Sequence, residues 1–339
     1  MLKVKSVLFI LILTFGLAAA HAGKLRQVAM VDLPGEPGFN EVAFANGQVV
    51  ISRPVTNTIE IFSPVKRRVV ARISQVEGPR GIAVDDQASR VYVALRGSSS
   101  IAVINSHNWQ VEKMIPVQHA PERLLWVPDI KALYASSYLD RTVSVVDPLA
   151  GRETSIAELN ALPEDMVFDA ARQQLFVSLQ DLSEVAVLDR SNKIVNRFRL
   201  QASEPTGLAL DKARNRLYVA VRFAVLELNA DNGSEIIRIP APGGTDTLVL
   251  DPNGNLLFAA GGDGSVLAID LNKNVVDHEL STDVKGFSIA YDASHHMIFM
   301  PGGREGRSKM VILSPISMAE PERPQTAENP KNSGETARK

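Results

Sequence analysis

Charged side chains that could bind a ligand or transfer a proton recur at regular intervals in this 339-residue chain. One series holds, about 42 residues apart, Arg80, Glu122, Glu164 and Asp246, and the positions that follow two of them are Arg123 and Asp165. A second series holds Arg53, Arg96, Arg222 and Arg304. Carboxylates can act as general bases or bind a hard cation, and arginines can hold an anionic group.

The chain offers few histidines and no cysteines for catalysis or metal binding. His119 lies three residues before Glu122, which suggests either an acid–base pair or a solvated loop pair. The other histidines do not form a set of zinc ligands, and the chain has no cysteine. Disulfides, thiolate metal sites, haem c attachment and a cysteine nucleophile are therefore excluded. No cofactor is predicted, and a divalent cation, Ca²⁺ or Mg²⁺, remains an option for the carboxylates.

A repeat of about 40 residues fixes where these groups lie. Proline recurs at 42-residue steps at Pro37, Pro79, Pro121, Pro163 and Pro205. A column of strand centres follows at Val50, Tyr92, Tyr134, Phe176, Tyr218, Phe258 and Phe299. Each unit holds four short apolar segments separated by turn residues, which is typical of a propeller blade rather than of a helical repeat. The prediction is an all-β, seven-bladed propeller with four-stranded blades.

The seventh unit lacks a fourth strand. An alternating apolar stretch at residues 25–33 precedes the first unit and has no repeat of its own. We therefore expect this N-terminal strand to complete the last blade, so that the two ends of the chain close the ring and remove an open sheet edge.

Propeller geometry would bring the charged series together. The loops before each innermost strand and those between the second and third strands open at one end of the central channel. The predicted funnel mouth therefore contains Arg80, Arg96, His119, Glu122, Arg123, Glu164, Asp165, Arg222, Asp246 and Arg304. These groups could form a ligand site, or they could be charged because loops at a wet rim face water. Which of them would be catalytic stays unknown.

The second strands of the units carry a family resemblance. They read YVAL at 92–95, YASS at 134–137, FVSL at 176–179 and YVAV at 218–221. These segments resemble the YVTN repeat of exported, seven-bladed bacterial and archaeal propellers, also called YncE-like, although no unit keeps the full tetrapeptide. The resemblance implies the fold and export. It transfers no catalytic residue, because propellers host lactonases, lyases, dehydrogenase subunits and binding platforms.

The sequences of the two termini and the net charge indicate where the protein is located and which classes of partner it can bind. Residues 1–22 have the basic start, apolar stretch and A-x-A site of a cleaved signal peptide, which predicts a periplasmic or secreted protein. The propeller is predicted at residues 23–318, followed by a polar, disordered tail at 319–339. Removing two lysines changes the net charge from −2 to −4. This charge argues against nucleic acid, and neither the short apolar stretch nor the mature chain predicts stable membrane insertion.

The predicted function is an exported, non-catalytic platform that binds a small molecule or docks an exported protein at its funnel mouth, as a monomer. The alternative is a propeller-type lactonase or lyase with a mouth Glu or His119 as base, with or without a divalent cation. A third option is an accessory subunit of a periplasmic redox enzyme whose partner holds the cofactor.

Overall fold

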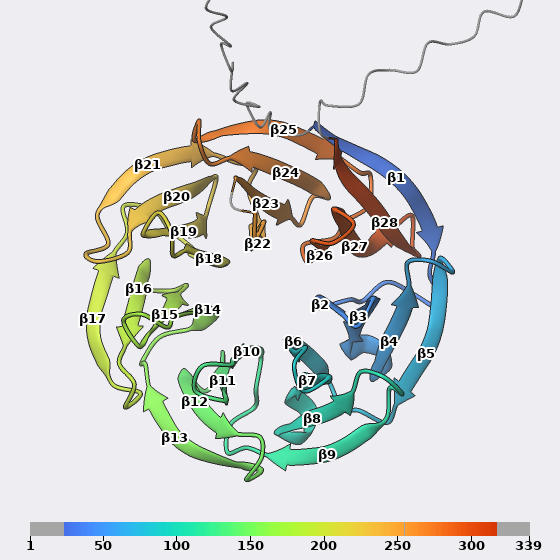
Figure 1. Cartoon of the computed structure of the whole chain (residues 1–339), viewed down its shortest axis with the longest axis horizontal. Helices are drawn as coiled ribbons and strands as arrows, with labels where there is room; N and C mark the ends of the chain where they lie inside the picture. Colours follow the sequence, from blue (N-terminus) through green and yellow to red (C-terminus); the bar gives the residue numbers. More distant parts are fainter. Residues whose placement is uncertain (1–23, 254, 317–339) are drawn as a thin grey trace, which may run out of the picture.

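The computed structural model describes residues 24–253 and 255–316, which form an all-β ring of seven four-stranded sheets (Figure 1). Each sheet is one blade with antiparallel strands, which follow chain order outward from the channel except that β1 is the outermost strand of blade 7. The predicted seven-bladed propeller is thereby confirmed. The predicted signal peptide and C-terminal tail lie outside the described residues.

The strands follow the repeat. Blade 1 contains β2 (Val42–Ala45), β3 (Gln48–Arg53), β4 (Thr58–Ser63) and β5 (Arg68–Ser74). Blade 2 contains β6 (Pro79–Asp85), β7 (Arg90–Leu95), β8 (Ser100–Asn105) and β9 (Val111–Pro116). Blade 3 contains β10 (Arg123–Val127), β11 (Ala132–Ser137), β12 (Thr142–Asp147) and β13 (Arg152–Glu158). Blade 4 contains β14 (Pro163–Asp169), β15 (Gln174–Leu179), β16 (Glu184–Leu188) and β17 (Ile194–Arg199).

The remaining blades close the circle. Blade 5 contains β18 (Leu208–Asp211), β19 (Arg216–Val221), β20 (Ala224–Asn229) and β21 (Glu235–Pro240). Blade 6 contains β22 (Thr245–Leu250), β23 (Leu256–Gly261), β24 (Ser265–Asp270) and β25 (Val275–Ser281). Blade 7 combines β26 (Ala290–Asp292), β27 (Met297–Arg304) and β28 (Arg307–Ile316) with β1 (Lys24–Asp32). Two short 3₁₀ turns are η1 (Pro54–Thr56) and η2 (Arg96–Ser98).

The hydrophobic core lies between the blades. Seven clusters of buried hydrophobic residues occur, one at each contact between adjacent blades. Every residue of the predicted strand-centre column is at most 1% exposed. Four of these rings pack against aromatic rings of the next blade: Tyr92 on Trp126, Tyr134 on Phe168, Phe258 on Tyr291 and Phe299 on Phe44. The second strands are therefore apolar on both faces because a neighbouring blade covers each face.

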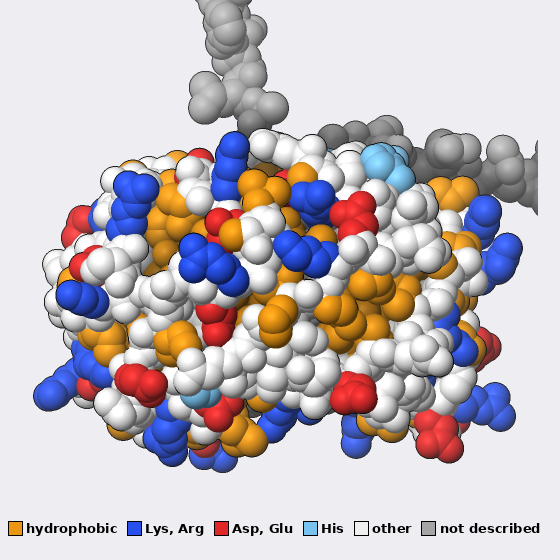
Figure 2. Space-filling view, turned by 90° about the horizontal axis from the view of Figure 1, so that it is seen from below, with side chains coloured by type: hydrophobic (Ala, Val, Ile, Leu, Met, Phe, Trp, Pro, Cys, Tyr) orange, Lys and Arg blue, Asp and Glu red, His pale blue; other side chains and the backbone are white. Residues whose placement is uncertain are grey.

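The outermost strands alternate instead. In β5 the burial pattern changes at every residue, as expected for a sheet edge with one face on the next blade and one in solvent. Figure 2 shows part of this outer wall, where hydrophobic side chains lie between scattered charged ones.

The ring closes as predicted from the N-terminal stretch. Strand β1 pairs with β28 in antiparallel fashion, from Lys24 opposite Ile316 to Asp32 opposite Lys309. The pairing shifts by one residue between Gln27 and Ala29, where a bulge occurs. The first and last strands therefore lie side by side as the outer half of blade 7 (Figure 1).

A buried arginine locks this closure. Arg53, expected at the rim, is 1% exposed and donates to the carbonyl oxygens of Pro34 (2.6 Å) and Glu36 in the link from β1 to β2. It also pairs with the buried carboxylate of Glu60 at 3.0 Å and reaches Ser308 of β28 at 3.4 Å. Arg53 is thus a structural group that joins blade 1 to both ends of the chain, and the rim prediction for it is wrong.

The alignment of the units by their recurring prolines is also wrong in the first unit. Val42 pairs with Ile51 in the way that Ile82 pairs with Val93, so residue 41 is equivalent to Gly81. Pro37 therefore lies two residues ahead of the position that Pro79 holds. The cause is the hairpin of blade 1, which turns through Asn46 and Gly47 alone.

Removing residues 24–34 tests the closure. The loss of β1 exposes the edge of β28 and removes the buried side chains of Leu25 and Leu33, each contributing about 1.5–3 kcal/mol. We expect aggregation or a melting temperature lower by roughly 10 °C, measured by calorimetry and light scattering. The control Lys24→Ser/Arg26→Ser keeps the strand and should match the parent. A truncated protein that melts like the parent would show that the ring closes without β1.

Arg53→Met tests the buried clamp. The substitution leaves the carboxylate of Glu60 without one of its two arginine partners, and breaking a buried pair costs about 3–5 kcal/mol. The matched control is Arg222→Met, which breaks the exposed pair with Glu204 and should cost at most about 1 kcal/mol. Urea unfolding of both variants measures the difference. Equal losses of unfolding free energy would contradict the clamp.

Candidate functional site

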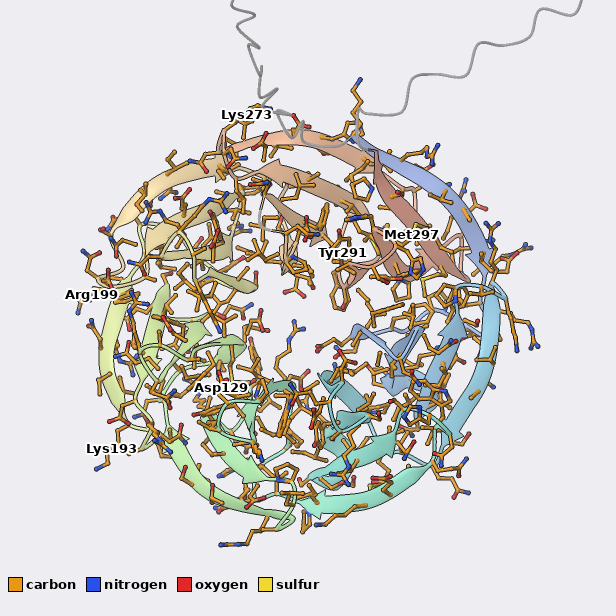
Figure 3. All side chains as sticks on the ribbon, viewed as in Figure 1. Asp129, Lys193, Arg199, Lys273, Tyr291 and Met297 are labelled. Carbon is orange, nitrogen blue, oxygen red and sulfur yellow. The ribbon has the colours of Figure 1, made fainter. Side chains whose placement is uncertain are left out.

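Two successive positions at the start of each innermost strand form the mouth of the channel. By strand register, the inner position holds Glu41, Gly81, Arg123, Asp165, Gly207, Thr247 and Ser288. The position before it holds Asn40, Arg80, Glu122, Glu164, Thr206, Asp246 and Phe287. Figure 3 shows side chains projecting from the innermost strands into the centre of the ring.

Arg123 is the centre of the mouth. Its guanidinium lies 3.3 Å from Glu41 of blade 1, 3.2 Å from Asp246 of blade 6 and 3.8 Å from Glu164 of blade 4. These four side chains are only 16–21% exposed. One cation from blade 3 thus joins carboxylates from three other blades across the channel.

Asp165 adds a fourth carboxylate to this group. Its oxygens accept hydrogen bonds from the backbone N–H groups of Met166 and Leu208, both at 2.8 Å. The second bond ties blade 4 to blade 5. Asp165 therefore combines a structural role at the inner strand with a negative charge close to Arg123.

Glu122 belongs to a separate group of charges. It pairs with Arg80 at 3.3 Å and with Arg96 at 3.2 Å. The carboxylates of Glu122, Glu164 and Asp246 were expected to bind one metal cation together. Instead, Glu122 pairs with Arg80 and Arg96, whereas Glu164 and Asp246 pair with Arg123. Within residues 24–253 and 255–316, no group of three or more Asp, Glu or His side chains is arranged to hold a metal ion.

The channel changes the proton affinity of its carboxylates. Burial raises the pKa of Glu41 to about 7 against the opposing effect of Arg123, and it raises the pKa of Glu164 to about 7 in the same way. Burial also raises the pKa of Asp165. Burial alone would lower the pKa of Arg123, but the surrounding carboxylates outweigh it and raise the pKa, so the guanidinium stays charged. The negative charge in the channel exceeds what one arginine can neutralise.

Three predicted site residues lie away from this network. His119 is 3.7 Å from Asp140, Arg222 pairs with Glu204, and Arg304 reaches outward to the sulfur of Met30. Their loops belong to the mouth side of the ring, and Arg222 and Arg304 line cavities beside the channel. The structure therefore gathers Arg80, Arg96, Glu122, Arg123, Glu164, Asp165 and Asp246 around the channel, and these three residues do not join the ion pairs of that group.

Sequence reasoning missed Glu41. The residue lies in the inner position of blade 1, but the alignment of the units by their prolines placed residue 39 there because the turn at Asn46 and Gly47 is two residues shorter than its counterparts. Counting back from the strand-centre column at Val50 through a two-residue Asn-Gly turn would have found it.

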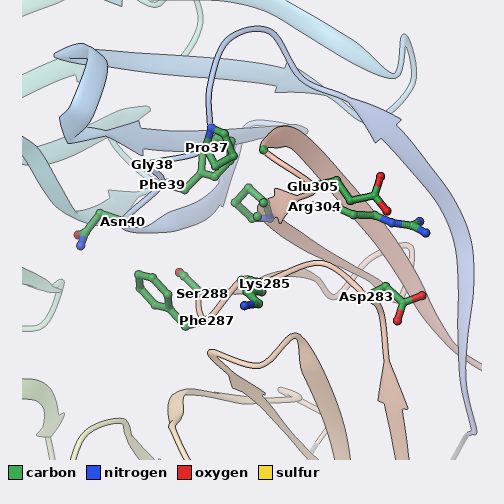
Figure 4. Close-up of a pocket in the computed structure, with 15 residues that line it drawn as sticks. Pro37, Gly38, Phe39, Asn40, Asp283, Lys285, Phe287, Ser288, Arg304 and Glu305 are labelled. Carbon is green, nitrogen blue, oxygen red and sulfur yellow. The ribbon is translucent and has the colours of Figure 1, made fainter.

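Two cavities open beside the channel. The larger, about 720 Å³, lies between blades 7 and 1 and is lined by Phe39, Asn40, Lys285, Phe287 and several glycines (Figure 4). The backbones are close here, since a Cβ on Gly302 would lie 2.5 Å from the carbonyl oxygen of Lys285. The smaller, about 370 Å³, is lined by residues of blades 4 to 7, including Asp246. Phe287 lines both cavities, so they form one surface with the channel.

Exposed hydrophobic side chains surround this surface. They come from the loops between the second and third strands of blades 1, 3, 4 and 5, and they are Val55 (69% exposed), Leu139 (65%), Leu182 (45%) and Phe223 (63%). Single exposed hydrophobic residues are ordinary on a protein surface. Four on equivalent loops of one face make an apolar rim around a polar channel.

A pH titration tests the electrostatics of the channel. The folded state keeps protons on Glu41 and Glu164 up to about pH 7, whereas glutamates of the unfolded chain release theirs near pH 4.5. The free energy of unfolding should therefore fall between pH 4.5 and 7, by several kcal/mol at about 1.4 kcal/mol per pKa unit for each of the two groups, and level off above pH 7. Glu41→Gln/Glu164→Gln should remove this part of the slope, and Glu158→Gln/Glu204→Gln should keep it. Parallel profiles for the parent and the channel variant would contradict the assignment.

No described helix is long and apolar enough to cross a lipid bilayer.

Comparisons with known proteins show the fold. No family model and no curated protein matches the chain. Solved structures match widely, with 1749 chains, and folds of this kind support unrelated functions. One match is hydrazine synthase of Kuenenia stuttgartiensis, with a TM-score of 0.72, 14% identity, and coverage of 85% of this chain and 97% of that chain. The chain is therefore a seven-bladed β-propeller similar to the propeller of hydrazine synthase, and its place in the YVTN-repeat family stays a prediction.

Proposed function

We propose that the protein is an exported, non-catalytic docking platform whose funnel mouth receives a partner protein. The carrying observation is the apolar rim of Val55, Leu139, Leu182 and Phe223 around the largely buried channel charges. Export and membership in the YVTN-repeat family belong to the same proposal. The N-terminal sequence motif and the repeat strands support them.

The rim offers anchors for an interface. Exposed aromatic and aliphatic side chains supply much of the binding energy in protein complexes when a partner covers them. Phe223 is held over Gly243, where an added Cβ would lie 2.6 Å from its ring, and Val55 packs in the same way on Gly38. These anchors are therefore positioned before binding, which reduces the entropy lost on association.

The charges of the mouth favour a basic partner. Five carboxylates, at positions 41, 122, 164, 165 and 246, face three arginines, at positions 80, 96 and 123. When all are ionised, the sum is −5 + 3 = −2, and this full excess is present above the pKa of about 7 of Glu41 and Glu164. A lysine or arginine on the partner would compensate this excess and fix the orientation of the complex.

A paired set of variants tests the docking surface. The mature protein is immobilised, exposed to the exported-protein fraction of its source, and the retained proteins are identified and then titrated individually. Leu139→Asp/Phe223→Asp places two charges on the rim and should weaken binding of the retained partner at least ~10-fold. Val195→Asp/Val275→Asp places two charges on the outer wall and should leave binding unchanged. A partner that binds both variants like the parent would refute docking at the mouth.

The alternative is a lactonase or lyase, and one observation favours it. Glu164 has a pKa of about 7, which suits a general base at neutral pH. Incubation with a panel of sugar lactones and uronates separates the two functions. Turnover by the parent that Glu164→Gln abolishes would establish an enzyme and overturn the non-catalytic proposal.

A further inference from the structure

A second hollow lies at the seam between blades 7 and 1, on the face opposite the mouth. It measures about 460 Å³ and is mostly apolar. The partly exposed ring of Phe44 lines it and stacks on the buried ring of Phe299, with the ring centroids 6.0 Å apart. Val28 and Ile312 of β1 and β28 form one wall, and Pro64 and Val65 of the turn between β4 and β5 form the other. We call this hollow the seam groove.

The seam groove results from two local irregularities. The blade 1 hairpin turns through two residues, and its Gly47 has open space where a Cβ would be. The bulge in β1 occurs at Val28, whose side chain remains 38% exposed. Val65, at the tip of its turn, is 90% exposed. Apolar surface is therefore left uncovered at the one seam where the repeat is interrupted.

Positive charge marks one end of the groove. Lys66, Arg67 and Arg68 follow Val65 directly, and none of the three makes an ion pair within the described part of the chain. Arg67 lines the groove. The carboxylate that also lines it, Asp292, is 5% exposed and is engaged by Ser294 and by His295 at 2.7 Å. The available charge of the groove is thus positive.

We propose that the seam groove binds a single anionic amphiphile, a medium-chain acyl carboxylate, with its chain on Phe44 and Val28 and its carboxylate at Arg67. The volume lies in the range of small-molecule sites, which are mostly apolar with a few placed polar groups. Arginine holds carboxylates through charge-assisted hydrogen bonds. This site is separate from the mouth and does not depend on the docking function.

The shape of the groove distinguishes this ligand from a lipid surface. A membrane is bound by protruding apolar side chains together with clusters of four to eight basic residues. Here three basic residues flank a hollow, and Val65 alone protrudes. A single acyl chain fits a hollow between two walls.

Calorimetric titration of the mature protein with dodecanoate, below its micelle concentration, tests the proposal. We expect one molecule bound per chain, at least ~10-fold more tightly than dodecyltrimethylammonium, which has the same chain and the opposite charge. Arg67→Gln should weaken dodecanoate at least ~10-fold, and so should Val65→Asp. Matched controls are Arg199→Gln, an exposed arginine of the outer wall, and Val55→Asp on the opposite face, and both should bind like the parent.

The following results would contradict the proposed site. Equal affinity for the two amphiphiles, or equal loss in the control variants, would show nonspecific adsorption. Binding to phosphatidylglycerol vesicles without binding to monomeric dodecanoate would assign the basic turn to a membrane surface instead. All four substituted residues are exposed, so circular dichroism should show unchanged folding.

Discussion

The pairing of β1 with β28 closes the ring and thereby holds all seven blades in place. Without β1, the outer edge of β28 would be unpaired and the hydrophobic cluster between blades 7 and 1 would be partly uncovered. Arg53 reinforces the closure by joining the link after β1, the carboxylate of Glu60 and Ser308 of β28. Because the hydrophobic clusters join only adjacent blades, this closure sets the distances across the channel.

The channel illustrates what a closed ring can impose on charges. Arg123 pairs with Glu41, Glu164 and Asp246. These three carboxylates come from blades 1, 4 and 6, no two of which are adjacent in the ring. In a surface loop such pairs would be worth little. Here burial raises the proton affinity of the carboxylates, and the network both fills the channel and keeps excess negative charge at the mouth.

Deviations from the repeat carry the individual features of the molecule. The shortened hairpin at Asn46 and Gly47 shifts Glu41 into the channel position and also leaves the seam groove open on the other face. The large mouth cavity lies at this same contact between blades 7 and 1. Repetition thus builds a stable ring, while the seam where the chain ends meet is free to differ.

The number of blades, the strand-centre column and the closing role of the N-terminal strand could all be predicted from the sequence, because period, turn residues and alternation are local properties. It also predicted that Arg123, Glu164 and Asp246 share the mouth. Folding was needed to show that Arg123 is the centre, that Glu41 joins it and that Arg53 is buried. It also showed that His119, Arg222 and Arg304 have other partners. Periodicity gives the height of a residue along the channel, whereas pairing across the channel depends on turn lengths and side-chain directions that no repeat encodes.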